Sequence, residues 1–370
     1  MKRRGVLFFV LVALLSCDSD EPVPLIRKYT LEKDSDLLFQ KYQGDNLFPL
    51  SKEQFAGLHV NADGSLLVVH TDYSAGRFTV SHLSSSFDFI GSKDFNETVG
   101  YVSRADNGEL VVQSTQGSNW LIRTLDQSIT ATSTHTIPIP NYFVRFTVNE
   151  TDYYMVEYNS GSATMTKYNG KGEQQWKKLL SEFAINFNVR QVFAENSDAF
   201  FLASENPAND SLTIARVNNQ NGALIWSSRF LKTELTESGV VNYLLPSSNG
   251  DLFLNGTDVA DPGIVHLSRI NNKGSVIQKR KVTLPDGTDS QAGPMLEETD
   301  GGVLVGLATD WTKEVASFRL LKTDSKLNGG WVGSFTQIAS GTITGIRKLP
   351  TGEVIVLTSN GHLYRLKPEQ

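Results

Sequence analysis

Cysteine is almost absent from this chain: Cys17 is the only one in 370 residues. An internal disulfide is therefore impossible, and so is a zinc or haem site built on several cysteines. Histidine is scarce as well, and the six histidines are spread singly along the sequence without the paired spacing of metal ligands. The sequence gives no reason to expect a disulfide framework or a histidine-rich metal centre.

Long apolar runs are also missing, with one short exception near the start. Residues 5–15 are apolar or glycine and follow Lys2, Arg3 and Arg4. A basic segment, a short apolar run and a small residue are typical of a secretory signal peptide. The alternative, a membrane-spanning helix, needs about 20 apolar residues. No later segment approaches that length, so we expect the rest of the chain to lie outside the membrane.

An excess of positive charge is lacking too. The formal net charge is −6, and it becomes −9 once Lys2, Arg3 and Arg4 are removed with the signal, because 31 basic and 40 acidic residues remain. Proteins that bind nucleic acid normally carry a basic patch or stripe. We therefore expect no nucleic-acid partner.

The junction Leu14-Leu15-Ser16-Cys17 resembles the lipobox of bacterial lipoproteins. This resemblance implies that the signal is removed before Cys17, which then carries lipid and attaches the protein to a membrane. The following tract, Asp18-Ser19-Asp20-Glu21-Pro22, is similar to the export signal of Bacteroidetes lipoproteins that reach the outer face of the outer membrane. The alternative is an ordinary solvated tether, because acidic segments with proline rarely fold.

These features predict three parts. Residues 1–16 are a lipoprotein signal peptide, residues 17–25 are an acidic flexible tether that begins at the lipidated Cys17, and residues 26–370 are a single domain. The expected localisation is that of an outer-membrane lipoprotein, with the leaflet left open.

The domain contains an internal repeat. Seven short turns, each followed by apolar residues, recur at spacings of roughly 44 to 53 residues, which is the range of propeller blades. The turns lie at Asp63-Gly64, Asn107-Gly108, Thr151-Asp152, Ser197-Asp198, Asn249-Gly250, Gly301-Gly302 and Thr351-Gly352. Asn-Gly and Asp-Gly between apolar runs are strong hairpin signals.

A second hairpin follows in several copies, for example around Gly172, Gly222 and Gly274. Two hairpins per repeat predict a four-stranded sheet, which is one propeller blade. We therefore expect an all-β propeller of seven blades, with six or eight as alternatives, and an array of β-sandwiches as the less favoured fold. The last repeat lacks a fourth strand, and residues 37–42 could supply it, so that strands from both termini close the ring.

The segment Val217 to Trp226 resembles the blade motif of quinoprotein-like (PQQ-like) propellers, in which an aspartate or asparagine sets the turn, a glycine closes it and a tryptophan docks between blades. Trp176, Trp226 and Trp331 match the docking position. Quinoprotein dehydrogenases commonly use a vicinal cysteine pair, which a chain with Cys17 alone cannot have. The resemblance therefore implies the fold and not the redox chemistry.

Candidate ligand-binding residues come from the loops that follow the second strand of each blade, which gather on one face of a propeller. Aromatic, carboxylate and amide groups together suit a sugar, whose faces stack and whose hydroxyls need hydrogen-bond partners. The candidates are Asp72, Tyr73, Trp120, Glu205, Asp210, Asp258, Asp261, Asp310 and Trp311. The alternative is that these loops are simply polar and that Trp120 begins a strand. Asp258 and Asp261 could also donate oxygens to calcium, although no cofactor is expected.

These observations favour a non-enzymatic, lipid-anchored binding or scaffold module for envelope proteins or an extracellular glycan. The alternative is a hydrolase or lyase that acts on polysaccharide through carboxylates of the same face. The two can be told apart, because an enzyme should gather several carboxylates and a basic residue in one pocket, whereas a scaffold should show an apolar or mixed patch on a blade rim.

Overall fold

The computed structural model describes most of the chain from Tyr29 onward. The described residues are 29–36, 53–72, 75–104, 109–138, 144–149, 152–159, 162–169, 171–185, 189–194, 198–206, 208, 210–236, 241–258, 261, 263–284, 290–309, 317–336, 342–359 and 361–368. Every strand and site discussed below lies within these ranges.

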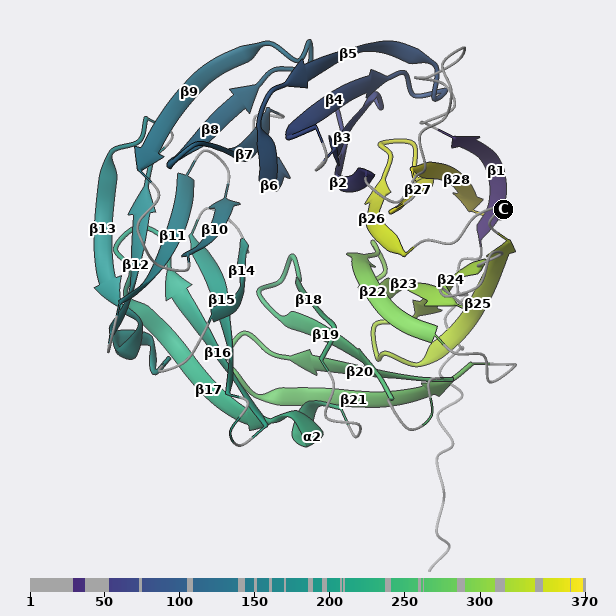
Figure 1. Ribbon diagram of the computed structural model, residues 1–370. Helices are drawn as coiled ribbons and strands as arrows, with labels where there is room; N and C mark the ends of the chain where they lie inside the picture. Colours follow the sequence, from purple (N-terminus) through teal and green to yellow (C-terminus); the bar gives the residue numbers. More distant parts are fainter. Residues whose placement is uncertain are drawn as a thin grey trace, which may run out of the picture.

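The chain folds into a ring of seven four-stranded antiparallel sheets, a seven-bladed β-propeller (Figure 1). Blade 1 contains β2 (Glu53–Val60), β3 (Leu66–Asp72), β4 (Arg77–Leu83) and β5 (Phe89–Phe95). Blade 2 contains β6 (Thr98–Arg104), β7 (Leu110–Gln116), β8 (Asn119–Leu125) and β9 (Ala131–Pro138). Blade 3 contains β10 (Val144–Asn149), β11 (Asp152–Asn159), β12 (Ser162–Tyr168) and β13 (Gln174–Leu179).

The remaining blades repeat this order. Blade 4 contains β14 (Val189–Ala194), β15 (Ala199–Asn206), β16 (Ser211–Asn218) and β17 (Leu224–Leu231). Blade 5 contains β18 (Tyr243–Pro246), β19 (Leu252–Thr257), β20 (Ile264–Ile270) and β21 (Val276–Thr283). Blade 6 contains β22 (Ser290–Glu297), β23 (Val303–Thr309), β24 (Ser317–Thr323) and β25 (Gly329–Thr336). The predicted fold and the predicted number of blades are confirmed.

Blade 7 closes the ring with strands from both ends of the chain. It contains β26 (Ile343–Lys348), β27 (Val354–Thr358) and β28 (His362–Pro368) from the C-terminal side, and β1 (Tyr29–Asp36) pairs with β28. The closing strand thus comes from the N-terminal side as predicted, but it precedes the segment expected to form it. Residues 37–42 lie outside the described part of the chain. The pairing of β1 with β28 covers the edge of β28 and joins the two ends of the chain within one sheet.

The turn around Gly274, in the described part of the chain, is one of the hairpin turns that the sequence predicted. In the turn before β21, the Asn271 side-chain Oδ1 accepts hydrogen bonds from the backbone N–H groups of Lys273 (3.0 Å) and Ser275 (2.9 Å). Gly274 has a φ of 80° and donates its N–H to the Asn271 carbonyl. A left-handed residue at this point lets the two strands continue in register, which is why glycine is favoured there.

Two short helical turns follow the outer strands of blades 3 and 4, namely η2 (Leu180–Phe183) and α2 (Lys232–Leu235). Among the described residues, no helix has the length and apolar character needed to cross a membrane.

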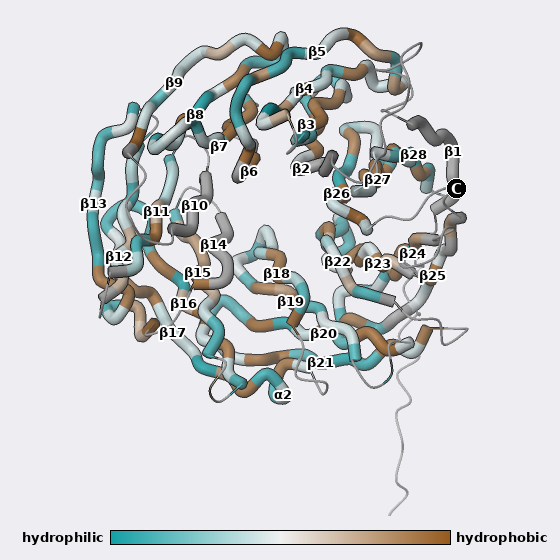
Figure 2. The backbone as a smooth tube through the Cα atoms, viewed as in Figure 1, coloured by the Kyte–Doolittle hydropathy of each residue, from teal (hydrophilic) through white to brown (hydrophobic). Residues whose placement is uncertain are grey.

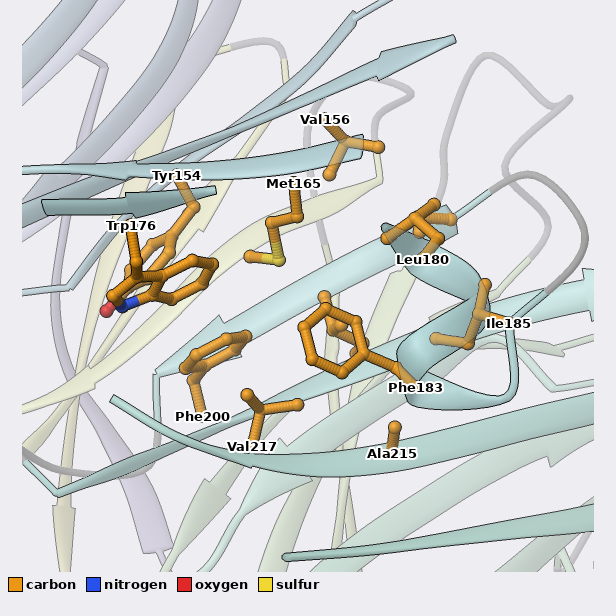
Figure 3. Close-up of a cluster of buried hydrophobic side chains, with 12 residues drawn as sticks. Tyr154, Val156, Met165, Trp176, Leu180, Phe183, Ile185, Phe200, Ala215 and Val217 are labelled. Carbon is orange, nitrogen blue, oxygen red and sulfur yellow. The ribbon is translucent and has the colours of Figure 1, made fainter. Parts of the chain in front are cut away.

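The hydrophobic core lies between neighbouring blades. Figure 3 shows the cluster between blades 3 and 4, where Trp176 packs against Tyr154 and Phe200. The Trp176 indole N–H donates to the Asn219 carbonyl of blade 4 at 3.1 Å. The predicted role of this tryptophan as an inter-blade docking residue is therefore observed directly.

Candidate functional site

The two faces of the propeller differ in their connections. Because the four strands of each blade are antiparallel, the first and third turns of every blade lie on one face, which we call the turn face. The loops after the second strands and the connections between blades lie on the other, which we call the loop face. The candidate ligand-binding residues were predicted from the sequence to lie on this loop face.

A pocket of about 310 Å³ lies near the axis of the ring, and we call it the axial pocket. The innermost strands of blades 5, 6 and 7, which are β18, β22 and β26 in Figure 1, supply most of its wall. Its lining residues are Tyr243, Gln291, Ala292, Gly293, Pro294, Ala308, Thr342, Ile343 and Thr344. These positions are the starts of first strands and the end of β23, so the axial pocket is at the loop-face end of the axis.

A bulge in β22 shapes the wall of the axial pocket. The pairing of β22 with β23 shifts between Ala292 and Met295, which places Gly293 and Pro294 outside the regular ladder. A Cβ on Gly293 would lie 3.4 Å from the carbonyl oxygen of Gly306 on β23, so the two strands approach closely there. Pro294 has no N–H to donate, which suits a position that has left the ladder.

Blade 5 holds this bulge in place. The Asn255 side-chain amide donates to the Gly293 carbonyl at 2.8 Å, and the Thr257 hydroxyl accepts from the Ala292 N–H at 2.7 Å. Both side chains are buried, and the Asn242 side chain in turn accepts from the Thr257 N–H at 2.9 Å. Because polar groups buried in this way are held at fixed positions, the wall is preorganised before any ligand arrives.

The other side of the axial pocket is fixed by blade 7. The Thr342 N–H donates to the Ser359 hydroxyl at 3.0 Å, and the Ser359 N–H donates back to the Thr342 carbonyl at 2.8 Å. The Thr344 hydroxyl donates to the Leu357 carbonyl at 3.3 Å. Tyr243 is half-buried, and its hydroxyl makes no hydrogen bond within the described part of the chain.

The described residues that line the axial pocket carry no charge. Its polar groups are a phenol, an amide and two hydroxyls, and no Asp, Glu, His, Lys or Arg is among the residues that line it. Such a site can offer hydrogen bonds and apolar contacts to a ligand. Among these lining residues it has no group suited to general acid–base catalysis near neutral pH.

The carboxylates predicted for the loop face are held within their own blades. Asp72, at the end of β3, lies 3.8 Å from the Arg77 guanidinium and accepts from the Ala75 N–H. In blade 4, Lys232 of α2 forms ion pairs with Glu205 and, at 2.9 Å, with Asp210. Burial alone would lower the pKa of Lys232, but its hydrogen bonds to Glu205 and Asp210 outweigh that effect and hold the pKa above its ordinary value.

Blade 5 holds the next pair of candidates. The Asp258 carboxylate lies 3.5 Å from Nε2 of the buried His266 and accepts from the Asp261 N–H, whereas Asp261 itself is exposed. No group of three or more His, Cys, Asp or Glu side chains in the described ranges is arranged to hold a metal ion. Asp258, one of the two predicted calcium donors, closes a turn by accepting the N–H of Asp261, the other.

Of the three aromatic candidates, Trp120 alone lies in the described ranges. Trp120 lies in β8 with 8 % of its surface exposed, as the alternative reading of that residue expected. Tyr73, Asp310 and Trp311 lie outside the described residues. None of the six predicted residues within the described ranges is among the residues that line the axial pocket, whose described wall comes mainly from the innermost strands of three blades.

Solved structures share this fold across most of the chain. The virginiamycin B lyase of Staphylococcus aureus, in a structure with quinupristin, is 12 % identical with a TM-score of 0.56, and the match covers 92 % of this chain and 99 % of that one. The WD40 propeller domain of Doa1 is 14 % identical with a TM-score of 0.57, covering 92 % and 98 %. The hydrazine synthase of Kuenenia stuttgartiensis is 10 % identical with a TM-score of 0.60, covering 87 % and 98 %.

These similarities are too low in identity to carry a function, and the three proteins differ in what they do. No known family and no curated protein matches the sequence. The comparisons therefore place the chain among seven-bladed β-propellers by its fold alone.

Proposed function

We propose that this chain is a lipid-anchored protein of the cell envelope that binds an uncharged segment of an extracellular glycan at the axial pocket, without cleaving it. The observation that carries this proposal is the wall of the pocket, whose described residues are polar or apolar and include no charged side chain. A charged ligand would lose its hydration there and find no counter-charge. A neutral sugar loses less hydration free energy on entering the pocket, and it gains hydrogen bonds to the wall.

The shape and composition of the pocket also suit a sugar ring. Its volume of about 310 Å³ is at the lower end for ligand pockets, which is appropriate for one or two sugar residues. Tyr243 offers an aromatic ring and a hydroxyl that has no hydrogen-bond partner among the described residues, and Gln291 is exposed beside it. Pro294, Ala308 and Ile343 offer apolar surface for the faces of the ring.

The alternative is an enzyme that acts on polysaccharide. It would need two carboxylates able to meet across one pocket. The described carboxylates of the loop face do not converge: Glu205 and Asp210 are paired with Lys232, and Glu97 of blade 2 is buried against Ser114 and Arg123. This arrangement supports binding over cleavage.

The test measures binding of neutral oligosaccharides, with cello-, malto- and xylo-oligosaccharides as probes, by titration calorimetry. We expect Tyr243→Ala to weaken binding at least tenfold and Tyr243→Phe to weaken it by about threefold to tenfold, because the second change removes only a hydrogen bond. Asp261→Ala is the control, since Asp261 is on the loop face but does not line the pocket.

Two outcomes would contradict the proposal. Loss of binding in Asp261→Ala together with full binding in Tyr243→Ala would move the site to the loops. Release of shortened oligosaccharides during the titration, detected by chromatography, would favour the polysaccharide-acting enzyme instead.

A further inference from the structure

The outer rim of the propeller carries the exposed hydrophobic residues of the molecule. In the described ranges, the large hydrophobic side chains that are exposed are Phe89, Ile90, Leu179, Leu224, Ile225, Leu231 and Ile277. Each of them lies on the outermost strand of its blade, on β5, β13, β17 or β21. Hydrophobic residues interrupt the hydrophilic outer strands in Figure 2 as well.

Two hydrogen bonds tie the outer strand of blade 4 to blade 5. The Trp226 indole N–H donates to the Asn272 carbonyl at 2.8 Å, and the Ser228 hydroxyl donates to the Gly274 carbonyl at 2.9 Å. β17 is thereby held against the turn that leads into Ile277 of β21. Ile277 is 48 % exposed, so the start of β21 offers apolar surface to a partner.

β21 adds positive charge to this surface. Lys279, Arg280 and Lys281 are consecutive and exposed, and they form the longest basic run after Arg4. Side chains alternate between the two faces of a strand. Arg280 Nε donates to Asn328 Oδ1 of blade 6 at 2.9 Å, so Ile277, Lys279 and Lys281 share the opposite face. We call these three residues the rim patch.

β21 is also a free sheet edge. The strand order of blade 5 is β18-β19-β20-β21, so one side of the eight-residue β21 makes no ladder hydrogen bonds within its sheet. Lysines on an edge strand repel basic strands and discourage non-specific pairing. The same charges favour a strand that places carboxylates directly opposite them.

We propose that the rim patch docks a partner protein through an acidic extended segment, which adds to blade 5 as a fifth strand beside β21. Strand addition supplies backbone hydrogen bonds for affinity, and the alternating side chains supply specificity. The segment that fits carries carboxylates opposite Lys279 and Lys281 and an apolar side chain opposite Ile277. This surface is separate from the axial pocket, so the proposal does not depend on the ligand bound there.

The probe is a fluorescent peptide, Thr-Glu-Thr-Glu-Thr-Val-Thr, which in antiparallel pairing sets its two carboxylates against Lys281 and Lys279 and its valine against Ile277. Fluorescence anisotropy measures its affinity for the intact protein. We expect the double variant Lys279→Glu with Lys281→Glu to weaken binding by about tenfold, since two attractive cross-strand pairs become repulsive. Lys93→Glu is the matched control, because Lys93 is an exposed lysine on the outer strand β5 of blade 1.

Two further probes separate strand addition from simple attraction of charge. An N-methylated form of the peptide keeps its charges but cannot complete a ladder, so it should bind at least tenfold more weakly. A peptide with every Glu replaced by Lys should not bind. Hydrogen exchange should show slower exchange of β21 backbone amides when the acidic peptide is present.

Three results would overturn the proposal. Equal affinity of the N-methylated and parent peptides would exclude strand addition. Unchanged affinity in the double variant would exclude the rim patch as the site. Sedimentation of the protein with phosphatidylglycerol vesicles, lost in the double variant and accompanied by no peptide binding, would assign the patch to a membrane surface.

Discussion

At the scale of single residues, the tryptophans of the fourth strands connect blades 3, 4 and 6 to the blades that follow them. Trp176 and Trp226 occupy matching register positions, opposite Lys167 and Arg216, and each donates its indole N–H to a turn carbonyl of the following blade. Trp331, opposite Lys322, packs against the cluster between blades 6 and 7. The sequence predicted all three positions because they recur at the same point of each repeat.

The cations opposite these positions are also structural. Lys322 is fully buried and lies 2.9 Å from the Asp300 carboxylate in the turn before β23. Burial raises the pKa of Asp300, but hydrogen bonds from the Gly302 N–H and Lys322 outweigh it and leave the pKa below its ordinary value. Lys167 with Asp152 and Arg269 with Asp251 repeat this pairing in blades 3 and 5.

Trp176→Ala should lower the free energy of unfolding by about 3–5 kcal/mol, since the indole is 8 % exposed and its removal leaves a cavity. Trp226→Ala should have a smaller effect, because Trp226 is only partly buried. Urea denaturation followed by circular dichroism measures both. Equal losses of unfolding free energy in the two variants would show that burial of the indole does not determine how much each tryptophan stabilises the protein.

At the scale of elements, the turn before the fourth strand of one blade packs against the fourth strand of the preceding blade. Gly222 and Gly274 face Trp176 and Trp226, and a Cβ on either glycine would lie 3.0 Å or less from the indole. Where the preceding blade has Gly91 or Gln278 at the tryptophan position, the turn carries Ile129 or Leu327 instead.

These two aliphatic residues adopt positive φ angles of 62° and 60°, which is an unfavourable conformation for such side chains. Both are buried, so the apolar surface that they remove from water offsets the strain. The junction of blades 2 and 3 follows another solution, in which Tyr153 and His135 lie against Gly172.

This complementarity predicts a compensating pair of changes. Gly222→Leu alone should destabilise the protein by at least 2 kcal/mol, since the new side chain meets Trp176 and takes a positive φ. Combined with Trp176→Ala it should be less harmful than the sum of the two single changes, because leucine fills part of the vacated space. A double-mutant cycle from urea denaturation measures the coupling, and additive losses would contradict the argument.

At the scale of the whole molecule, closure of the ring and the proposed attachment to a membrane involve the same end of the chain. β1 is the outermost strand of blade 7, and residues 18–28 separate it from Cys17. Eleven residues can span at most about 40 Å. An anchor at Cys17 would therefore keep blade 7 close to the membrane surface.

Cys17→Ala should release the protein from the membrane fraction into the soluble fraction, because the acyl chains proposed for this residue hold the protein through buried methylene groups. Fractionation of cells followed by immunoblotting measures the distribution, and Cys17→Ser serves as a second variant without the thiol. Retention of both variants in the membrane fraction would rule out lipid on Cys17 as the anchor.

The sequence by itself determined the strands, the turns and the number of blades. This was possible because alternation of apolar residues and the chemistry of turn residues such as Asn271 and Gly274 act over a few neighbours and recur seven times. The segment that closes the ring was placed slightly too late, since pairing of β1 with β28 is a contact between the two ends of the chain.

Only the tertiary structure decided where a ligand could bind. The axial pocket brings together Tyr243, Gln291 and Thr342, which belong to three different blades and carry no shared motif. The sequence offered the loop carboxylates as ligand-binding candidates. In the structure, Lys232 forms ion pairs with two of them, Glu205 and Asp210, within blade 4. Contacts of this kind depend on how the blades curve around the axis, and no local pattern encodes that arrangement.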